Sequence, residues 1–96
     1  MLELRPVCEH CYKSLPPDSD DAMVCSYECT FCKSCVEHVL HNVCPNCGGG
    51  FEKRPVRPKE KLLNDPATNK IIYKPVDMGS FYDLDSKYRN IRPEER

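Results

Sequence analysis

The stretch that decides the fold runs from Cys25 to Cys47 and reads CSYECTFCKSCVEHVLHNVCPNC. It holds six of the eight cysteines of the chain, and the other two, Cys8 and Cys11, form a close pair near the start. Zinc takes four ligands in a tetrahedron, and cysteines spaced two residues apart are typical of its structural sites. Eight thiols in four close pairs therefore predict two complete zinc sites.

Length and composition favour the same conclusion. The chain has 96 residues, no tryptophan and only 8% aromatic residues, so its hydrophobic core is thin for a domain of this size. Its first residues lack the basic and apolar regions of a signal peptide, and no apolar run is long enough to span a membrane. We therefore expect a cytoplasmic chain without membrane contact, in which reduced thiols bind zinc rather than form disulfides.

The four cysteine pairs could combine in more than one way. A sequential arrangement would join the first pair with the second and the third with the fourth. An interleaved arrangement would join the first with the third and the second with the fourth. Interleaving is favoured because only two residues separate Cys29 from Cys32, so one short hairpin would tie both metals together. A rival arrangement places the middle four cysteines on one metal and the outer four on the other, namely Cys25, Cys29, Cys32 and Cys35 against Cys8, Cys11, Cys44 and Cys47.

Local patterns around the cysteines predict one hairpin and one short helix. Residues 22–27 have the composition of a strand, and residues 28–32 form its return arm. Ser34 can cap a following helix, with Glu37 three residues later as its capping-box partner. Apolar residues then recur at helical spacing. The predicted core consists of Val24, Phe31, Val36, Val39, Leu40 and Val43.

The second half of the chain differs in composition from the first. The segment Lys53–Lys59 is basic and interrupted by prolines, and residues 60–96 carry no evident helical period. We expect a double-zinc module over residues 1–52, followed over 53–96 by a basic linker and an extended, partly disordered arm. The alternative is that Lys70 to Val76 pairs with a strand edge, either in the same chain or in a second copy, which would give a homodimer.

Two segments resemble the RING finger, a zinc-binding module with two interlocked sites. They are CTFCKSC at residues 29–35 and CPNC at residues 44–47. Cys29 stands where that family usually has histidine, so the chain resembles the all-cysteine variety. The resemblance implies a small α+β fold with a cross-brace of two structural zinc ions. The ligands that it implies are Cys8, Cys11, Cys32 and Cys35 for one zinc and Cys25, Cys29, Cys44 and Cys47 for the other.

A second resemblance covers more of the chain but implies no activity. The segments LRP at 4–6, LPP at 15–17, ECTFC at 28–32 and CPNCGG at 44–49 are similar to those of small bacterial cysteine-rich proteins. These proteins form an uncharacterised family, the domain of unknown function 1272.

Functionally, closed four-cysteine sites predict a structural zinc module that acts in protein–protein interaction with an unknown partner. We expect no catalysis, because no nucleophile with a base and no phosphate-binding loop is evident. One alternative is a ubiquitin-ligase-like RING, although Glu9, His10 and Gly48 stand where ligase contacts are expected. The other is nucleic-acid binding through residues 53–61. It is disfavoured because residues 1–50 hold seven acidic and three basic residues.

Overall fold

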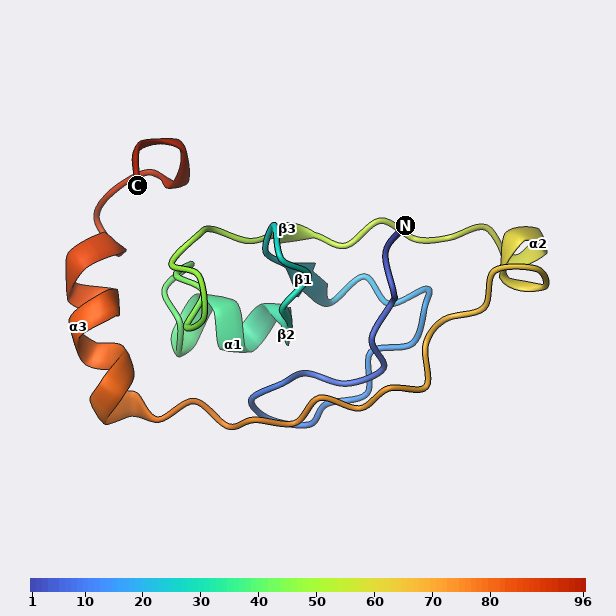
Figure 1. The fold of residues 1–96 in the computed structure, drawn as a ribbon, viewed down its shortest axis with the longest axis horizontal. Helices are drawn as coiled ribbons and strands as arrows, with labels where there is room; N and C mark the ends of the chain where they lie inside the picture. Colours follow the sequence, from blue (N-terminus) through green and yellow to red (C-terminus); the bar gives the residue numbers. More distant parts are fainter.

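The computed structural model describes residues 1–96 and contains a three-stranded antiparallel sheet with few helices (Figure 1). Strands β1 (Ala22–Val24) and β2 (Thr30–Cys32) form the predicted hairpin, in which Met23 lies opposite Phe31. On its other side β1 pairs with β3 (Glu52–Lys53), so the strand order is β2-β1-β3. The boundary predicted between residues 52 and 53 thus falls inside a strand.

Helix α1 (Lys33–His38) is shorter than the apolar pattern predicted, and its predicted cap is absent. Cys32 rather than Ser34 is the N-cap residue, and no side chain caps the helix. The helix ends at His38, and the chain turns shortly after it. His41 and Asn42 make this turn with φ angles of 50° and 60°. The turn still buries apolar residues that the sequence assigned to the helix, namely Leu40 and Val43.

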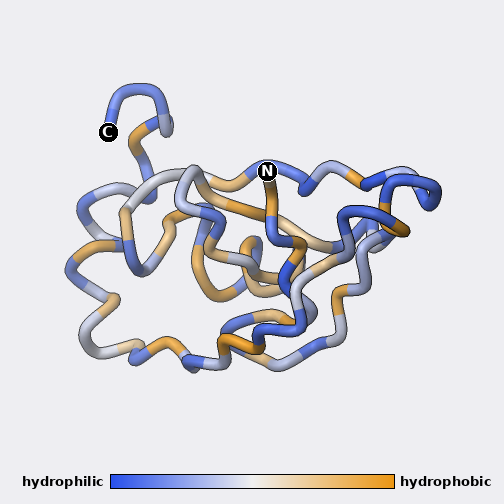
Figure 2. The backbone as a smooth tube through the Cα atoms, turned by 45° about the vertical axis from the view of Figure 1, so that its right-hand side comes forward, coloured by the Kyte–Doolittle hydropathy of each residue, from blue (hydrophilic) through white to orange (hydrophobic).

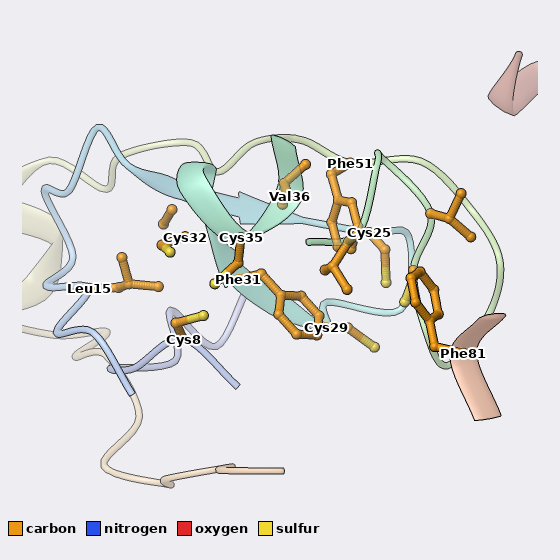
Figure 3. Packing of buried hydrophobic residues seen from close by; sticks show 14 residues of the cluster. Cys8, Leu15, Cys25, Cys29, Phe31, Cys32, Cys35, Val36, Phe51 and Phe81 are labelled. Carbon is orange, nitrogen blue, oxygen red and sulfur yellow. The ribbon is translucent and has the colours of Figure 1, made fainter. Parts of the chain in front are cut away.

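A single hydrophobic cluster lies between the sheet, α1 and the cysteine loops (Figure 3). Phe31 lies at its centre, where its ring meets the ring of Phe51 edge-on with centroids 5.5 Å apart. Of the predicted core, Val24 and Val39 are only partly buried, whereas the other four members are buried. The cluster also contains the six buried cysteines, whereas Cys11 and Cys47 are exposed.

The C-terminal half contains helices that the sequence did not predict. These are α2 (Lys59–Leu62), α3 (Met78–Tyr88) and the 3-10 turn η1 (Pro93–Glu95). The expectation of an extended arm without helix is therefore wrong for α3. Asp77 caps this helix by accepting hydrogen bonds from the backbone N–H groups of Gly79 and Ser80. Only Phe81, Leu84 and Tyr88 carry the apolar period of this helix. Gly79 and the surrounding polar residues make that period too weak to recognise in the sequence.

Between α2 and α3 the chain runs extended beside the N-terminal segment (Figure 1). The backbone N–H of Thr68 donates to the carbonyl of Glu3 at 2.9 Å, and that of Lys74 to the carbonyl of Glu9 at 2.8 Å. No strand forms over residues 70–74, so the pairing that we considered for this segment is replaced by single hydrogen bonds within the same chain.

Hydrophobic stretches gather in the middle of the molecule, and the outer turns are hydrophilic, including the C-terminal turn (Figure 2). None of the helices has both the length and the apolar character needed to cross a membrane.

Candidate metal centre

The first cysteine cluster gathers four sulfur atoms from a turn near the N-terminus, the end of β2 and helix α1. The Sγ atoms of Cys8, Cys11, Cys32 and Cys35 all lie within 4.8 Å of one another. Cys8 and Cys11 belong to a tight turn, in which the N–H of Tyr12 donates to the carbonyl of Cys8 at 3.0 Å. Cys32 ends β2 and Cys35 lies in α1. The first and third pairs therefore lie together, as the interleaved arrangement requires.

The second cysteine cluster gathers three sulfur atoms, those of Cys25, Cys44 and Cys47. Cys25 follows β1, and the other two belong to a turn closed by the N–H of Gly48, which donates to the carbonyl of Cys44 at 2.8 Å. Gly48 has a φ of 77°, a conformation that suits glycine. Cys29, the fourth predicted ligand, lies outside this group, and its Sγ accepts a hydrogen bond from Asn46 Nδ2 at 3.4 Å.

The spacing of the sulfurs suits a metal rather than a disulfide. Four sulfurs around a zinc at about 2.3 Å would lie about 3.8 Å apart, and the Sγ atoms of Cys11 and Cys32 are 3.7 Å apart. A disulfide needs about 2.05 Å, and all eight cysteines are free. Figure 3 shows Cys8, Cys32 and Cys35 on one side of Phe31 and Cys25 on the other. The two cysteine clusters can therefore hold metal, with the core between them.

Burial keeps several of these thiols protonated when no cation is present. It is the largest cause that raises the pKa of Cys25 to about 11, and it also raises the pKa values of Cys35 and Cys44. At Cys11 burial acts in the same direction but is outweighed by hydrogen bonds, first from the backbone N–H of Lys13, so this pKa is lowered. A metal entering either cluster must displace protons, because thiolates and not thiols are its ligands.

Glu9 joins the first cysteine turn to the hairpin from a buried position. Its carboxylate accepts the backbone N–H of Thr30 at 2.7 Å, and its own N–H donates to the carbonyl of Thr30 at 3.0 Å. Arg5 Nη1 lies 3.4 Å from the same carboxylate and balances its charge. The sequence analysis considered Glu9 only as a departure from the residues expected for ligase contacts, and it missed this role because burial of a charge depends on distant partners.

Arg54 was predicted in a basic linker, yet only 1% of its surface is exposed. Its guanidinium donates to three backbone carbonyls, those of Arg5 at 2.8 Å, Leu15 at 3.1 Å and Pro16 at 2.8 Å. Burial lowers the pKa of Arg54, and the three carbonyls are the partners that a buried cation requires. Arg57 likewise donates to backbone carbonyls, including that of Leu2 at 2.6 Å.

Helix α3 packs against the second cysteine cluster. Phe81 is buried in the core. A Cβ on Gly48 would lie 2.9 Å from the ring of Tyr88, so the lack of a side chain at Gly48 lets α3 approach this loop closely. Asp85 lies 3.3 Å from His41 Nδ1 and 3.5 Å from Arg89. The helix therefore covers the loop that carries two of the cysteines.

Comparisons with known proteins agree with the cysteine pattern. A family described as a protein of unknown function, DUF1272, matches residues 1–57. Uncharacterized protein R02474 of Rhizobium meliloti (strain 1021) is 55% identical over 75 residues, which cover 78% of this chain and 89% of that protein. No solved structure matches the chain. The range matched by the family contains all eight cysteines and Arg54. On this basis the chain belongs to the DUF1272 family.

Proposed function

We propose that the chain is a structural zinc-binding module with two Zn²⁺ ions in a RING-like cross-brace. One ion is held by the first cysteine cluster. The other is held by the second cluster with Cys29 as its fourth ligand, giving the interleaved set of eight cysteines. The observation that carries this proposal is the set of four sulfurs in the first cluster, whose mutual distances of 4.8 Å or less suit one tetrahedral ion.

The metals would stabilise rather than catalyse, because a site filled by four cysteines leaves no position for a substrate. Structural zinc contributes on the order of 10 kcal/mol to small domains, which would supplement the small core described above. Eight free thiols are also consistent with a cytoplasmic location, where cysteines remain reduced.

The module would serve in protein–protein interaction. An exposed aromatic pair supports this proposal: Tyr12 and Tyr73 meet edge-on with ring centroids 5.0 Å apart, and about half of each side chain remains exposed. Aromatic residues of this kind are enriched at protein interfaces. Nucleic-acid binding gains no comparable support, because Arg54 and Arg57 direct their guanidinium groups to carbonyls of the protein itself.

Native mass spectrometry of the intact protein tests the metal content. We expect two zinc ions per chain, and loss of one ion in the Cys35→Ser variant. Ser34→Ala, a change at an exposed neighbour in α1, should retain both and serves as the matched control. A folded protein without metal, or one metal in the unsubstituted chain, would contradict the proposal.

A further inference from the structure

One side chain of the C-terminal strap, residues 78–96, bridges the second cysteine loop, residues 42–48. Nη1 of Arg96 donates a hydrogen bond to the carbonyl of Asn42 at 2.8 Å and another to the carbonyl of Gly48 at 3.0 Å. These two carbonyls stand at the two ends of the loop, with both of its cysteines between them. A single nitrogen atom therefore joins the ends of the loop that supplies two sulfurs of the second cluster.

The rest of the strap packs on the same loop. Helix α3 runs along the end of the molecule where the chain leaves α1 (Figure 1). The ring of Tyr88 lies against Gly48, and Pro93 lies so close to Gly50 that a Cβ there would be 2.5 Å from the proline ring. Cζ of Arg96 lies 5.9 Å from the centroid of the Tyr88 ring. The loop can therefore be held at close range because two of its contact points lack side chains.

The polar contacts of the strap reach only one of the two cysteine clusters. Besides the two bonds from Arg96, the strap is joined to the module by the pair between Asp85 and His41, which precedes the loop directly. The turn of the first cluster contacts an earlier part of the segment, since the backbone N–H of Val76 donates to His10 Nδ1 at 3.0 Å. A change in the strap should therefore affect the second cluster and spare the first.

Arg96 holds backbone carbonyls in the same way as Arg54. Its third acceptor is the carbonyl of Ile91, which Nε reaches at 2.9 Å, so both guanidinium groups donate to three carbonyls. Arg54 is buried, whereas Arg96 is partly exposed. Water can replace the carbonyls at an exposed guanidinium at little cost, so Arg96 fastens its loop less firmly than Arg54 fastens the N-terminal loops.

We infer that Arg96 is a positioning residue for the second metal site, and that docking of the strap and metal binding by Cys44 and Cys47 strengthen each other. The inference rests on the proposed zinc sites and goes beyond them, because it makes only one site depend on residues 78–96. A loop that is already held at both ends loses less conformational entropy when its two sulfurs bind a metal. By linkage, the metal must then stabilise the docked strap in return.

Chelator competition at equilibrium tests whether the second site depends on Arg96. Native mass spectrometry of the zinc-loaded protein counts the metals, and a short pulse of alkylating reagent with peptide mapping identifies the freed cysteines. Arg96→Gln should weaken the second site about tenfold, as expected for hydrogen bonds from a charged donor near the surface. Alkylation should then fall on Cys44 and Cys47, with the first site unchanged. Arg92→Gln, at an exposed arginine that pairs with Glu95 in the same turn, is the matched control.

Hydrogen exchange tests the reciprocal effect of the metal on the strap. Cys47→Ser removes a ligand of the second site, so exchange over residues 78–88 should accelerate about tenfold or more. Cys11→Ser, at the equally exposed cysteine of the first turn, is the matched control and should leave exchange over these residues slow. In Arg96→Gln the loop amides of Cys44 and Gly48 should exchange faster, because the ends of the loop are no longer joined.

The outcomes separate this inference from the proposed function. Fewer than two metals in the unsubstituted chain would refute the zinc sites and, with them, the coupling. Two metals that are bound equally well with and without Arg96 would refute the positioning role alone. Equal weakening of both sites in Arg96→Gln would show a general loss of stability and would contradict the inference. Equal acceleration over residues 78–88 in the two cysteine variants would contradict it as well.

Discussion

The cysteine module, residues 1–57, and the C-terminal segment, residues 58–96, are held in different ways. Of the 21 buried residues, only Phe81 and Asp85 lie beyond residue 57. The module is fixed by sulfur clusters, a small sheet and the buried Arg54, whereas the segment is attached at a few points along its length. In a chain with a small hydrophobic core, side chains that bind several partners at once therefore hold distant segments together. The C-terminal segment depends on its contacts with the module.

Removing metal is expected to have the largest effect, and it should act on both regions. A chelator at neutral pH should unfold the module, because each structural zinc contributes on the order of 10 kcal/mol. The C-terminal segment should lose its order with it, since its anchors lie on the module. Circular dichroism and NMR dispersion measure the loss, and re-addition of zinc is the control. A chelated protein with an unchanged NMR spectrum would show that hydrophobic packing alone suffices.

Acid should also destabilise the module, because it favours the metal-free form. The raised pKa values of Cys25, Cys35 and Cys44 mean that these thiols hold their protons at neutral pH when no metal is present, so falling pH favours the metal-free form. For each thiol proton that the metal must displace, metal binding weakens about tenfold when the pH falls by one unit. We expect zinc release to increase as pH falls from about 8 to about 4, followed with a metal-sensitive dye. Release that is independent of pH would argue against thiolate ligands.

Arg54→Ala should destabilise the metal-loaded module by about 3 kcal/mol or more. Three carbonyls would lose their donor, and each unsatisfied buried group costs about 1–3 kcal/mol. Chemical denaturation with zinc present measures the free energy of unfolding. Lys53→Ala, a change at the exposed neighbour in β3, is the matched control and should have little effect. Equal effects of the two substitutions would mean that the carbonyl contacts of Arg54 contribute little.

Phe81→Ala should release α3 while leaving the sheet intact. Truncating a buried phenylalanine costs about 3–5 kcal/mol, but here the loss is limited to the free energy with which the helix docks. Hydrogen exchange should therefore accelerate over residues 78–88 and remain slow over β1 and β2. Tyr82→Ala, whose side chain is 69% exposed, should leave exchange unchanged. Faster exchange throughout the chain would indicate that the two regions unfold as one unit.

Asp85→Asn should have the smallest effect. The buried Asp85 carboxylate faces His41 and Arg89 at 3.3 and 3.5 Å, and because both partners are partly exposed to solvent, each ion pair contributes about 0.5–1 kcal/mol. Asp83→Asn on the exposed side of α3 is the control. Thermal melting at low and high salt measures the difference, which should shrink as salt is added. A salt-independent difference would point to hydrogen bonding rather than charge.

The sequence predicted best those features that depend on local pattern. The hairpin followed from a β-prone run between cysteines, and the contact of the first cysteine pair with the third agrees with interleaving. The end of α1 could not be predicted, since Leu40 and Val43 continue a helical period in the sequence, whereas the chain turns at His41 and Asn42. Helix α3 was missed because its polar face and Gly79 mask a short apolar period.

The burial of Glu9 and Arg54 could not be predicted for a different reason. Charged residues normally lie in solvent, and these two are buried because they contact backbone groups that are distant in the sequence. The acceptors of Arg54 belong to residues 5, 15 and 16, so its role is visible only once the fold is known. The position of Cys29 outside the three-sulfur group also depends on tertiary contacts, among them the hydrogen bond that its Sγ accepts from Asn46.

The position of Arg54 along the chain has a consequence for the order of assembly during synthesis. All eight cysteines precede it, and so do its three acceptors. A nascent chain therefore exposes every thiol to the cell before the residue that fastens the N-terminal loops has left the ribosome. In the proposed zinc module, metal capture would begin on an open chain, and the guanidinium of Arg54 would then fasten the loops around the cysteines.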